Sequence, residues 1–141
     1  MFNKKLAIVG ASGAVGRVFI ELLDEIYPGT KDLFLVASKR SAGRSMFCGK
    51  QEFIIQDIEE FDFSQVEIAF FSAGAETAEK YAPIAVSKGC TVIDNSSQFR
   101  TDLDKPLIVP EVNSKDLKSF KFPGIIANPN CSTAQLVVAL K

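Results

Sequence analysis

The sequence predicts an α/β domain with a doubly wound, mostly parallel sheet and flanking helices. Short, continuous apolar runs alternate with longer segments of helical periodicity, which is the pattern of repeated βαβ units. Turns rich in glycine, serine and asparagine follow several of these runs, at the places where open α/β sheets bind ligands. The 141 residues suffice for one such domain, and 47% hydrophobic residues indicate a globular chain.

The composition excludes several classes of function. A net charge of −1 gives no electrostatic reason to expect nucleic acid or an anionic membrane as a partner. No apolar run approaches the roughly 20 residues that cross a bilayer, and the start of the chain is interpreted as a strand, not a signal peptide. Cys48, Cys90 and Cys131 are odd in number and widely spaced, which fits neither a disulfide framework nor a zinc site. We therefore expect a cytoplasmic protein without a metal.

The first predicted unit has the order of a dinucleotide-binding motif. An apolar strand over residues 4–9 leads directly to Gly10-Ala-Ser-Gly-Ala-Val-Gly16, and a helix is predicted over 17–27. The spacing G-x-x-G-x-x-G permits a tight turn and a close approach of backbone N–H groups to a pyrophosphate, so Gly10, Gly13 and Gly16 are candidates for cofactor binding in a Rossmann-like domain. The alternative is a strand-to-helix turn without a ligand. The expected apolar side of the helix consists of Val18, Leu22, Leu23 and Ile26.

The second strand, over residues 33–37, is followed by a basic loop. An acid at the end of this strand would bind the ribose of NAD, but residues 38–44 contain no acid and three basic residues. An arginine here can accept a 2′-phosphate, which favours NADP over NAD. The alternative is a solvated loop.

The middle of the chain predicts a short hairpin and a further strand. Residues 46–55, interrupted at Gly49-Lys50, are typical of a hairpin, and residues 57–63 are expected to form a connecting turn. A strand over 66–71 leads to Ser72-Ala-Gly74, whose small residues leave room for a ligand to approach the backbone.

A helix over residues 76–87, kinked by Pro83 and ended by Gly89, is expected next. The strand over 90–94 then leads to the polar turn Asn95-Ser-Ser-Gln-Phe-Arg100. Arg100 can make a bidentate contact with a carboxylate or phosphate, or it can be a solvated loop residue.

The last part of the chain predicts a loop, a short helix and a final strand. Residues 102–106 are typical of a loop, residues 107–112 form a short apolar segment, and Asn113 is expected to cap a helix over 115–118. A buried strand over 124–127 follows.

The stretch Asn128-Pro-Asn-Cys131 places a cysteine at a strand-turn-helix junction. A helix begins at or near Cys131, and backbone N–H groups at a helix N-terminus favour a thiolate and lower the pKa of a cysteine. The same N–H groups and the Asn130 amide could stabilise an oxyanion. The residue types fit a nucleophilic cysteine and its alternative, a buried core cysteine next to an Asn-Pro turn, about equally well.

The chain contains no histidine, the commonest general base for such a nucleophile. It also ends ten residues after Cys131, within a helical pattern. We interpret residues 1–141 as an NAD(P)-binding domain that ends just after the catalytic cysteine, with a C-terminal catalytic and dimerisation domain absent.

Several motifs together resemble those of the aspartate-semialdehyde dehydrogenases. The resemblance extends through nearly the whole chain, in the order of the family. The matching stretches are Gly10–Gly16, Phe70-Phe-Ser-Ala-Gly74, Val92-Ile-Asp-Asn-Ser-Ser-Gln-Phe-Arg100, Val109-Pro-Glu-Val-Asn113 and Ile126-Ala-Asn-Pro-Asn-Cys-Ser-Thr133.

The resemblance implies NADP-dependent reductive dephosphorylation of L-4-aspartyl phosphate to L-aspartate 4-semialdehyde and phosphate, an early step in lysine, threonine and methionine synthesis. It implies a thioacyl intermediate on Cys131, which the neighbouring Asn130 helps to hold. It also implies a homodimeric or homotetrameric complete enzyme whose second domain supplies a histidine acid/base. The implied phosphate or substrate contacts are Arg100 and Asn95. The implied cofactor contacts are Ser12, Gly13, Ala14, Val15, Ser38, Arg40 and Ser41, with Ser72, Ala73 and Gly74 beside the nicotinamide.

Two other functions stay open from the sequence. An enzyme similar to N-acetyl-glutamyl-phosphate reductase would use related chemistry on a related fold. A noncatalytic NADP-binding module would bind the cofactor without a reactive cysteine.

Overall fold

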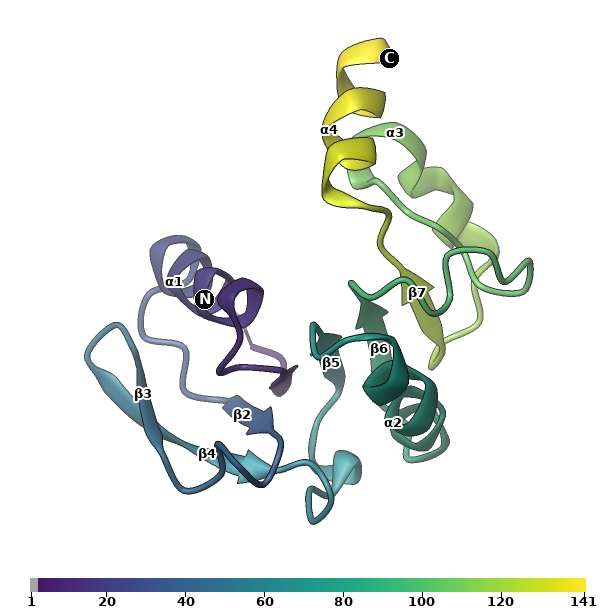
Figure 1. The fold of residues 1–141 in the computed structure, drawn as a ribbon. Helices are drawn as coiled ribbons and strands as arrows, with labels where there is room; N and C mark the ends of the chain where they lie inside the picture. The colour runs from purple at the N-terminus through teal and green to yellow at the C-terminus, as the bar shows by residue number, and fades with distance from the viewer. Residues whose placement is uncertain (1–2) are drawn as a thin grey trace.

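The computed structural model describes residues 3–141 and contains one seven-stranded sheet (Figure 1). The strand order is β3-β4-β2-β1-β5-β6-β7, and all neighbouring strands are parallel except β3 and β4. The predicted α/β fold with a doubly wound, Rossmann-like sheet is confirmed. The strands are β1 (Leu6–Val9), β2 (Leu33–Ala37), β3 (Ser45–Cys48), β4 (Gln51–Asp57), β5 (Ile68–Phe71), β6 (Thr91–Asp94) and β7 (Ile125–Ala127).

The two longest helices cover opposite faces of the sheet. Alternate residues of β1 point to opposite faces, as the period of a strand requires. Leu6 and Ile8 join the buried cluster that contains Ile20 of α1, whereas Val9 joins the cluster that contains Ala82 of α2. The helices are α1 (Ala14–Ile26), α2 (Ala75–Ser87), α3 (Pro110–Asn113) and α4 (Cys131–Leu140), with 3₁₀ turns η1 (Phe63–Gln65) and η2 (Ser114–Ser119).

The structure corrects the prediction for α1 in two respects. The helix begins at Ala14, three residues before the expected start, so the second half of the glycine motif is already helical. The buried residues of α1 are Gly16, Ile20 and Leu23. Of the four residues expected on its apolar side, only Leu23 faces the sheet. The exposed fractions of the other three are 53% for Val18, 48% for Leu22 and 63% for Ile26.

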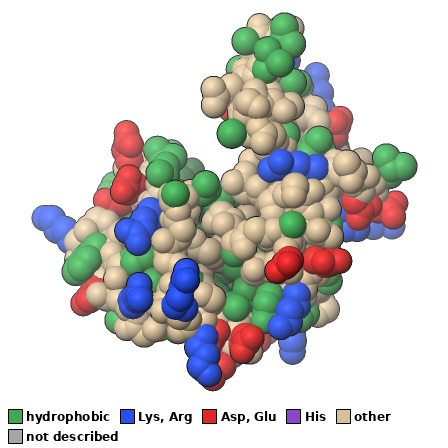
Figure 2. Space-filling model, viewed as in Figure 1, with side chains coloured by type: hydrophobic (Ala, Val, Ile, Leu, Met, Phe, Trp, Pro, Cys, Tyr) green, Lys and Arg blue, Asp and Glu red, His purple; other side chains and the backbone are tan. Residues whose placement is uncertain are grey.

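Close packing of Gly16 explains this orientation. A Cβ built on Gly16 would lie 2.4 Å from the Gly10 carbonyl oxygen and 2.8 Å from Ala11 Cα. The absence of a side chain lets α1 approach the turn at Gly16, which turns Ile20 and Leu23 toward the sheet. The second apolar stripe of the helix then faces outward (Figure 2).

The segment expected as a plain connecting turn, residues 57–63, contributes to the core. Phe61 and Phe63 are 8% and 2% exposed, and their rings meet edge to face with centroids 5.0 Å apart. Phe63 also stacks on Phe71 of β5, with ring centroids 6.0 Å apart. The hairpin of β3 and β4 is confirmed, but β4 additionally lies parallel to β2, with Leu35 opposite Ile55.

Two predictions near α3 and α4 have different outcomes. Asn113 does not cap the 3₁₀ turn η2 with its side chain; its Oδ1 accepts from Val109 N at 2.8 Å, and its Nδ2 donates to Leu107 O at 2.9 Å. A helix beginning at Cys131 is confirmed, yet α4 contains no buried residue. Within residues 3–141, no helix has the length and apolar character needed to cross a membrane.

Candidate active site

The candidate site residues lie at one edge of the sheet. The strands β1, β5, β6 and β7 run in the same direction, so the turns that begin at Gly10, Ser72, Asn95 and Asn128 all follow carboxyl ends. Three strand spacings separate β1 from β7, or about 14 Å at 4.8 Å per strand. The glycine turn and Cys131 therefore share the edge at which open α/β sheets bind their ligands.

The glycine turn is a close-packed cradle. Gly10 has φ +90°, and its N–H donates to Val36 O at 2.8 Å. A Cβ on Gly10 would lie 2.8 Å from the carbonyl carbon of Ser72, so the turns after β1 and β5 contact each other through backbone alone. Gly13 is the N-cap of α1 and has no side chain that could bond the first N–H groups of the helix. These N–H groups therefore remain available at this edge of the sheet.

A pocket of about 280 Å³ opens above this cradle. It unites the glycine turn, the end of β2 and the turn after β5, as the sequence predicts for a cofactor site. The predicted residues that line it are Gly10, Ser12, Gly13, Ser38, Ser72 and Ala73.

Four further residues of the pocket were not predicted as cofactor contacts: Val9, Ala37, Ile58 and Thr77. Ile58 comes from the segment after β4, and its N–H donates to Ala37 O at 2.9 Å, so its position depends on the unforeseen pairing of β4 with β2. Thr77 lies in the first turn of α2. Its place near the N-terminus of a helix that follows a glycine turn is a sequence signal that could have identified it.

Other predicted cofactor residues lie outside this pocket. Val15 is 48% exposed on α1, and Gly16 packs beneath the turn. Ser41 is 6% exposed, and its N–H donates to Ser38 O at 2.8 Å, so it shapes the basic loop. Arg40 is exposed, and within residues 3–141 its guanidinium forms no ion pair. Ala14 and Gly74 also lie outside the lining.

Cys131 is the first residue of α4 and is exposed, which excludes the alternative of a buried core cysteine. Asn130 is the N-cap; its Oδ1 accepts from Ser132 N at 3.0 Å and from Ser132 Oγ at 2.7 Å. Cys131 Sγ lies 3.7 Å from the same oxygen. The capping side chain thus holds the thiol at the positive end of the helix dipole, where an anion is favoured.

The other two cysteines differ from Cys131 in their surroundings. Cys48 and Cys90 are both buried. Burial raises the pKa of the Cys90 thiol to about 12. Burial, with a smaller effect from the negative charge of Asp24, also raises the pKa of Cys48. A thiol with a raised pKa is a poor nucleophile near neutral pH.

The Arg100 guanidinium joins the turns after β6 and β7. Its Nε donates to Asn128 O at 2.9 Å and its Nη2 to Asn95 O at 3.0 Å. The two asparagine side chains are also bonded, with Asn128 Nδ2 donating to Asn95 Oδ1 at 2.7 Å. The structure therefore brings Arg100 and Asn95 together with the turn that leads to Cys131.

Asp94, the last residue of β6, fixes the start of the turn that leads from Asn95 to Arg100. Its side chain is fully buried and accepts from Ser96 N at 3.0 Å and from Ser96 Oγ at 2.7 Å. Burial raises the pKa of the Asp94 carboxyl, and this effect outweighs the opposing effects of the two hydrogen bonds and of the Arg100 charge.

The geometry agrees with the sequence comparisons. Residues 5–120 match the family described as semialdehyde dehydrogenase, NAD binding domain. The chain belongs to this family. Its relatives include the aspartate-semialdehyde dehydrogenase of Shewanella violacea, which is 54% identical over 96% of this chain. Aspartate-semialdehyde dehydrogenase 2 of Vibrio cholerae is 52% identical over the same share.

Solved structures of semialdehyde dehydrogenases have the same fold. Aspartate semialdehyde dehydrogenase II from Vibrio cholerae matches 99% of this chain with a TM-score of 0.93 and 51% identity, over 42% of its own length. The Candida albicans enzyme, solved with NADP, matches 98% of this chain with a TM-score of 0.78 and 30% identity, over 46% of its own length. The chain spans about 40% of the length of the curated relatives that it matches.

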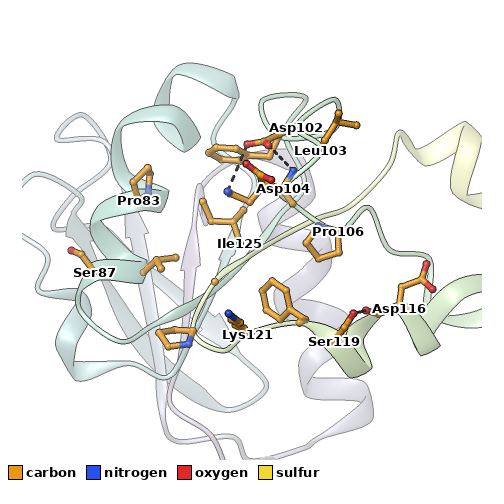
Figure 3. A pocket seen from close by; sticks show the side chains of 16 residues that line it. Pro83, Ser87, Asp102, Leu103, Asp104, Pro106, Asp116, Ser119, Lys121 and Ile125 are labelled. Carbon is orange, nitrogen blue, oxygen red and sulfur yellow. Dashed lines mark hydrogen bonds and ion pairs between the residues drawn. The ribbon is translucent and has the colours of Figure 1, made fainter.

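A larger cavity, about 870 Å³, lies away from the candidate site, and Figure 3 shows the side chains that line it. Its lining includes Pro83 near the C-terminal end of α2 and Ile125 at the start of β7, the end opposite to Cys131. Asp102 is engaged within its own loop, accepting from Asp104 N at 2.9 Å and pairing with Lys105 Nζ at 3.7 Å. This cavity therefore offers no group that converges on the cysteine.

Proposed function

We propose that this chain is the cofactor-binding and nucleophile-bearing part of an aspartate-semialdehyde dehydrogenase. The proposed reaction is the NADP-dependent reductive dephosphorylation of L-4-aspartyl phosphate to L-aspartate 4-semialdehyde and phosphate. The observation that carries the proposal is the exposed Cys131 thiol at a helix N-terminus, on the same sheet edge as the glycine cradle.

The proposed chemistry begins at the sulfur. The Cys131 thiolate attacks the acyl carbon, the carbon–oxygen bond to phosphate breaks, and a thioester forms as phosphate leaves. When bound, NADPH supplies the hydride that reduces this thioester. Collapse of the resulting tetrahedral adduct returns the thiolate and releases the aldehyde.

Asn130 and Arg100 have separate proposed roles. The Asn130 Oδ1 is engaged as the helix cap, so its Nδ2, which has no protein partner among residues 3–141, is the atom available to the thioacyl oxygen. Arg100, with Asn95, is the proposed phosphate contact. A guanidinium bound to the turn that leads to the nucleophile favours both binding of the acyl phosphate and departure of the phosphate dianion.

The residues of the glycine turn fit a dinucleotide. A Cβ at Gly10 or Gly16 would collide with neighbouring backbone, so both glycines permit the close packing of the turn, and open backbone N–H groups lie at the start of α1. Arg40 and the other basic residues of the loop after β2 lack an acidic counterpart there, which supports NADP over NAD. The solved relative with NADP is consistent with this choice.

The absence of histidine from residues 1–141 supports a further part of the proposal: the general acid/base belongs to a second, C-terminal domain of the complete enzyme. The chain alone then has little or no dehydrogenase activity. A cytoplasmic location and a homodimeric or homotetrameric complete enzyme belong to the same proposal, and light scattering on the complete gene product tests the assembly.

The test is turnover of the complete gene product, followed by NADPH absorbance with aspartate semialdehyde, phosphate and NADP. We expect Cys131→Ser to lower kcat by about a thousandfold or more, whereas Cys48→Ala retains turnover. Undiminished turnover in Cys131→Ser would refute the proposal. A preference for the N-acetylglutamyl substrate would instead indicate an enzyme similar to N-acetyl-glutamyl-phosphate reductase. Binding of NADP without turnover would indicate a noncatalytic NADP-binding module.

A further inference from the structure

We propose that the side-chain hydrogen bond between Asn95 and Asn128 is a positioning clamp. It holds the Arg100 guanidinium toward the turn that carries Cys131, so that an anion meets the thiol and the arginine together. The inference rests on the proposed function, because it assigns to Arg100 an anionic substrate group. Asn128 has no part in the proposed function, and Asn95, proposed there as a phosphate contact, is here assigned the further role of positioning Arg100.

The clamp is a closed ring of three hydrogen bonds. Arg100 Nε donates to Asn128 O at 2.9 Å, and Arg100 Nη2 donates to Asn95 O at 3.0 Å. Asn128 Nδ2 closes the ring by donating to Asn95 Oδ1 at 2.7 Å. All three residues are half-buried, so these bonds are partly shielded from competition with water.

The ring orients Arg100 but does not neutralise it. A guanidinium has five N–H donors, of which the ring uses two, so three remain for a ligand. Both acceptors are neutral carbonyl oxygens, and no carboxylate of residues 3–141 lies within 4.0 Å of this guanidinium. The Arg100 charge also acts on the buried Asp94 carboxyl, but it forms no ion pair there. An oriented, half-buried cation with free donors is suited to a phosphate or carboxylate.

The backbone explains why the side-chain bond matters. Asn95 N donates to Phe71 O at 2.8 Å, which fixes it to β5, and Asn128 N donates to Asp94 O at 2.8 Å, which fixes it to β6. Three residues after Asn128 comes Cys131, within about 10 Å along the chain. The bond between the two amides thus sets the separation of the loop that carries the arginine from the loop that carries the thiol.

The experiment compares two alkylating probes on Cys131. Iodoacetate is anionic and iodoacetamide is neutral, so the ratio of their rates reports the cation near the sulfur. The same ratio in urea-unfolded chain is the reference. We expect the native chain to prefer iodoacetate relative to this reference, and inorganic phosphate to slow the labelling.

Asn128→Leu removes the amide and keeps the branching and the number of heavy atoms of the side chain. We expect the iodoacetate preference to fall about three- to tenfold, protection by phosphate to weaken by a similar factor, and the iodoacetamide rate to change less than twofold. Asn95→Ala removes the other partner of the same bond and is expected to lower the iodoacetate preference by a similar factor, which keeps the inference testable if Asn128→Leu does not fold. Asn3→Leu makes the same exchange at an exposed position before β1 and should change neither probe.

The outcomes separate this inference from the proposed function, because neither probe needs the cofactor or an acyl phosphate. An unchanged iodoacetate preference in a folded Asn128→Leu or Asn95→Ala protein would overturn the clamp even if the complete enzyme is active. A native chain without any iodoacetate preference would also overturn it. Loss of the preference in both variants supports the clamp even if the complete enzyme turns over a different substrate.

Discussion

Replacement of Gly16 by alanine tests the packing that orients α1. In an ordinary helix interior this change stabilises by about 1 kcal/mol, because alanine has the higher helix propensity. Here the new Cβ would lie 2.4 Å from the Gly10 carbonyl oxygen and 2.8 Å from Ala11 Cα. Both obstacles belong to the backbone, and Ala11 is fully buried, so no side chain can rotate away.

The helix or the turn must therefore move by about 1 Å to restore van der Waals contact. Overpacking of this kind costs about 1–3 kcal/mol, and we expect the upper end because the backbone itself must shift. After the gain in propensity, a net loss of about 2 kcal/mol remains, which corresponds to a fall in Tm of roughly 4–8 °C.

The assay is thermal and urea unfolding of the chain, with NADP titration as a second measurement. Gly13→Ala is the matched control, because Gly13 has φ −76° and its added Cβ would lie 3.2 Å from the same oxygen. We expect this control to lose less than about 1 kcal/mol. If Gly16→Ala were as stable as the unchanged chain, or more stable, the reasoning from close packing would be refuted.

Two further predictions follow from the surroundings of individual side chains. Iodoacetamide at neutral pH should alkylate Cys131 more than about a hundredfold faster than Cys48 or Cys90, because the latter two thiols are buried and their pKa values are raised. Peptide mapping measures the three rates, and urea should abolish the difference between them. Equal rates in the folded chain would contradict the interpretation. Because burial raises the folded-state pKa of Asp94 above its unfolded value, the Asp94-dependent part of the unfolding free energy should rise as pH falls from neutral through the folded-state pKa, and should level off below the unfolded value of about 3.9. Urea unfolding from pH 7 to pH 4, with Asp94→Asn as the comparison, measures this; a comparison profile with the same slope would remove Asp94 as the cause.

The sequence contains enough information to predict the order of the elements and the edge that carries the site. Continuous apolar runs such as residues 33–37 predict buried parallel strands, because both faces of such strands are covered. Glycine and Asn-Pro turns mark their carboxyl ends. Consequently the glycine turn and the cysteine could be placed on one edge before the structure was known.

Long-range packing accounts for most of what could not be predicted. Two apolar stripes run along α1, and periodicity alone does not say which one faces the sheet; the close contact of Gly16 with Gly10 decides. The place of Ile58 in the pocket depends on the parallel pairing of β4 with β2, which local propensity does not specify.

The hydrogen-bond ring around Arg100 could not be predicted for a similar reason. Asn128 lies 28 positions after Arg100 and 33 positions after Asn95 in the chain. The residue types are those of ordinary polar turns, and only the pairing of β6 with β7 brings them together.

The helix that begins at Cys131 has only ten residues, and none of them is buried. The short helix α3 lies against α4. A helix of ten residues with so little packed on it is marginal in water, so its amides should exchange with solvent rapidly. Fraying would scatter the aligned peptide dipoles that favour an anion at Cys131, and with them the nucleophilic strength of the sulfur. Leu136 and Leu140 are 58% and 75% exposed. A protein surface that packs on them would stabilise the helix and, through it, the thiolate of Cys131. The free energy of that packing is therefore linked to the reactivity of the thiol.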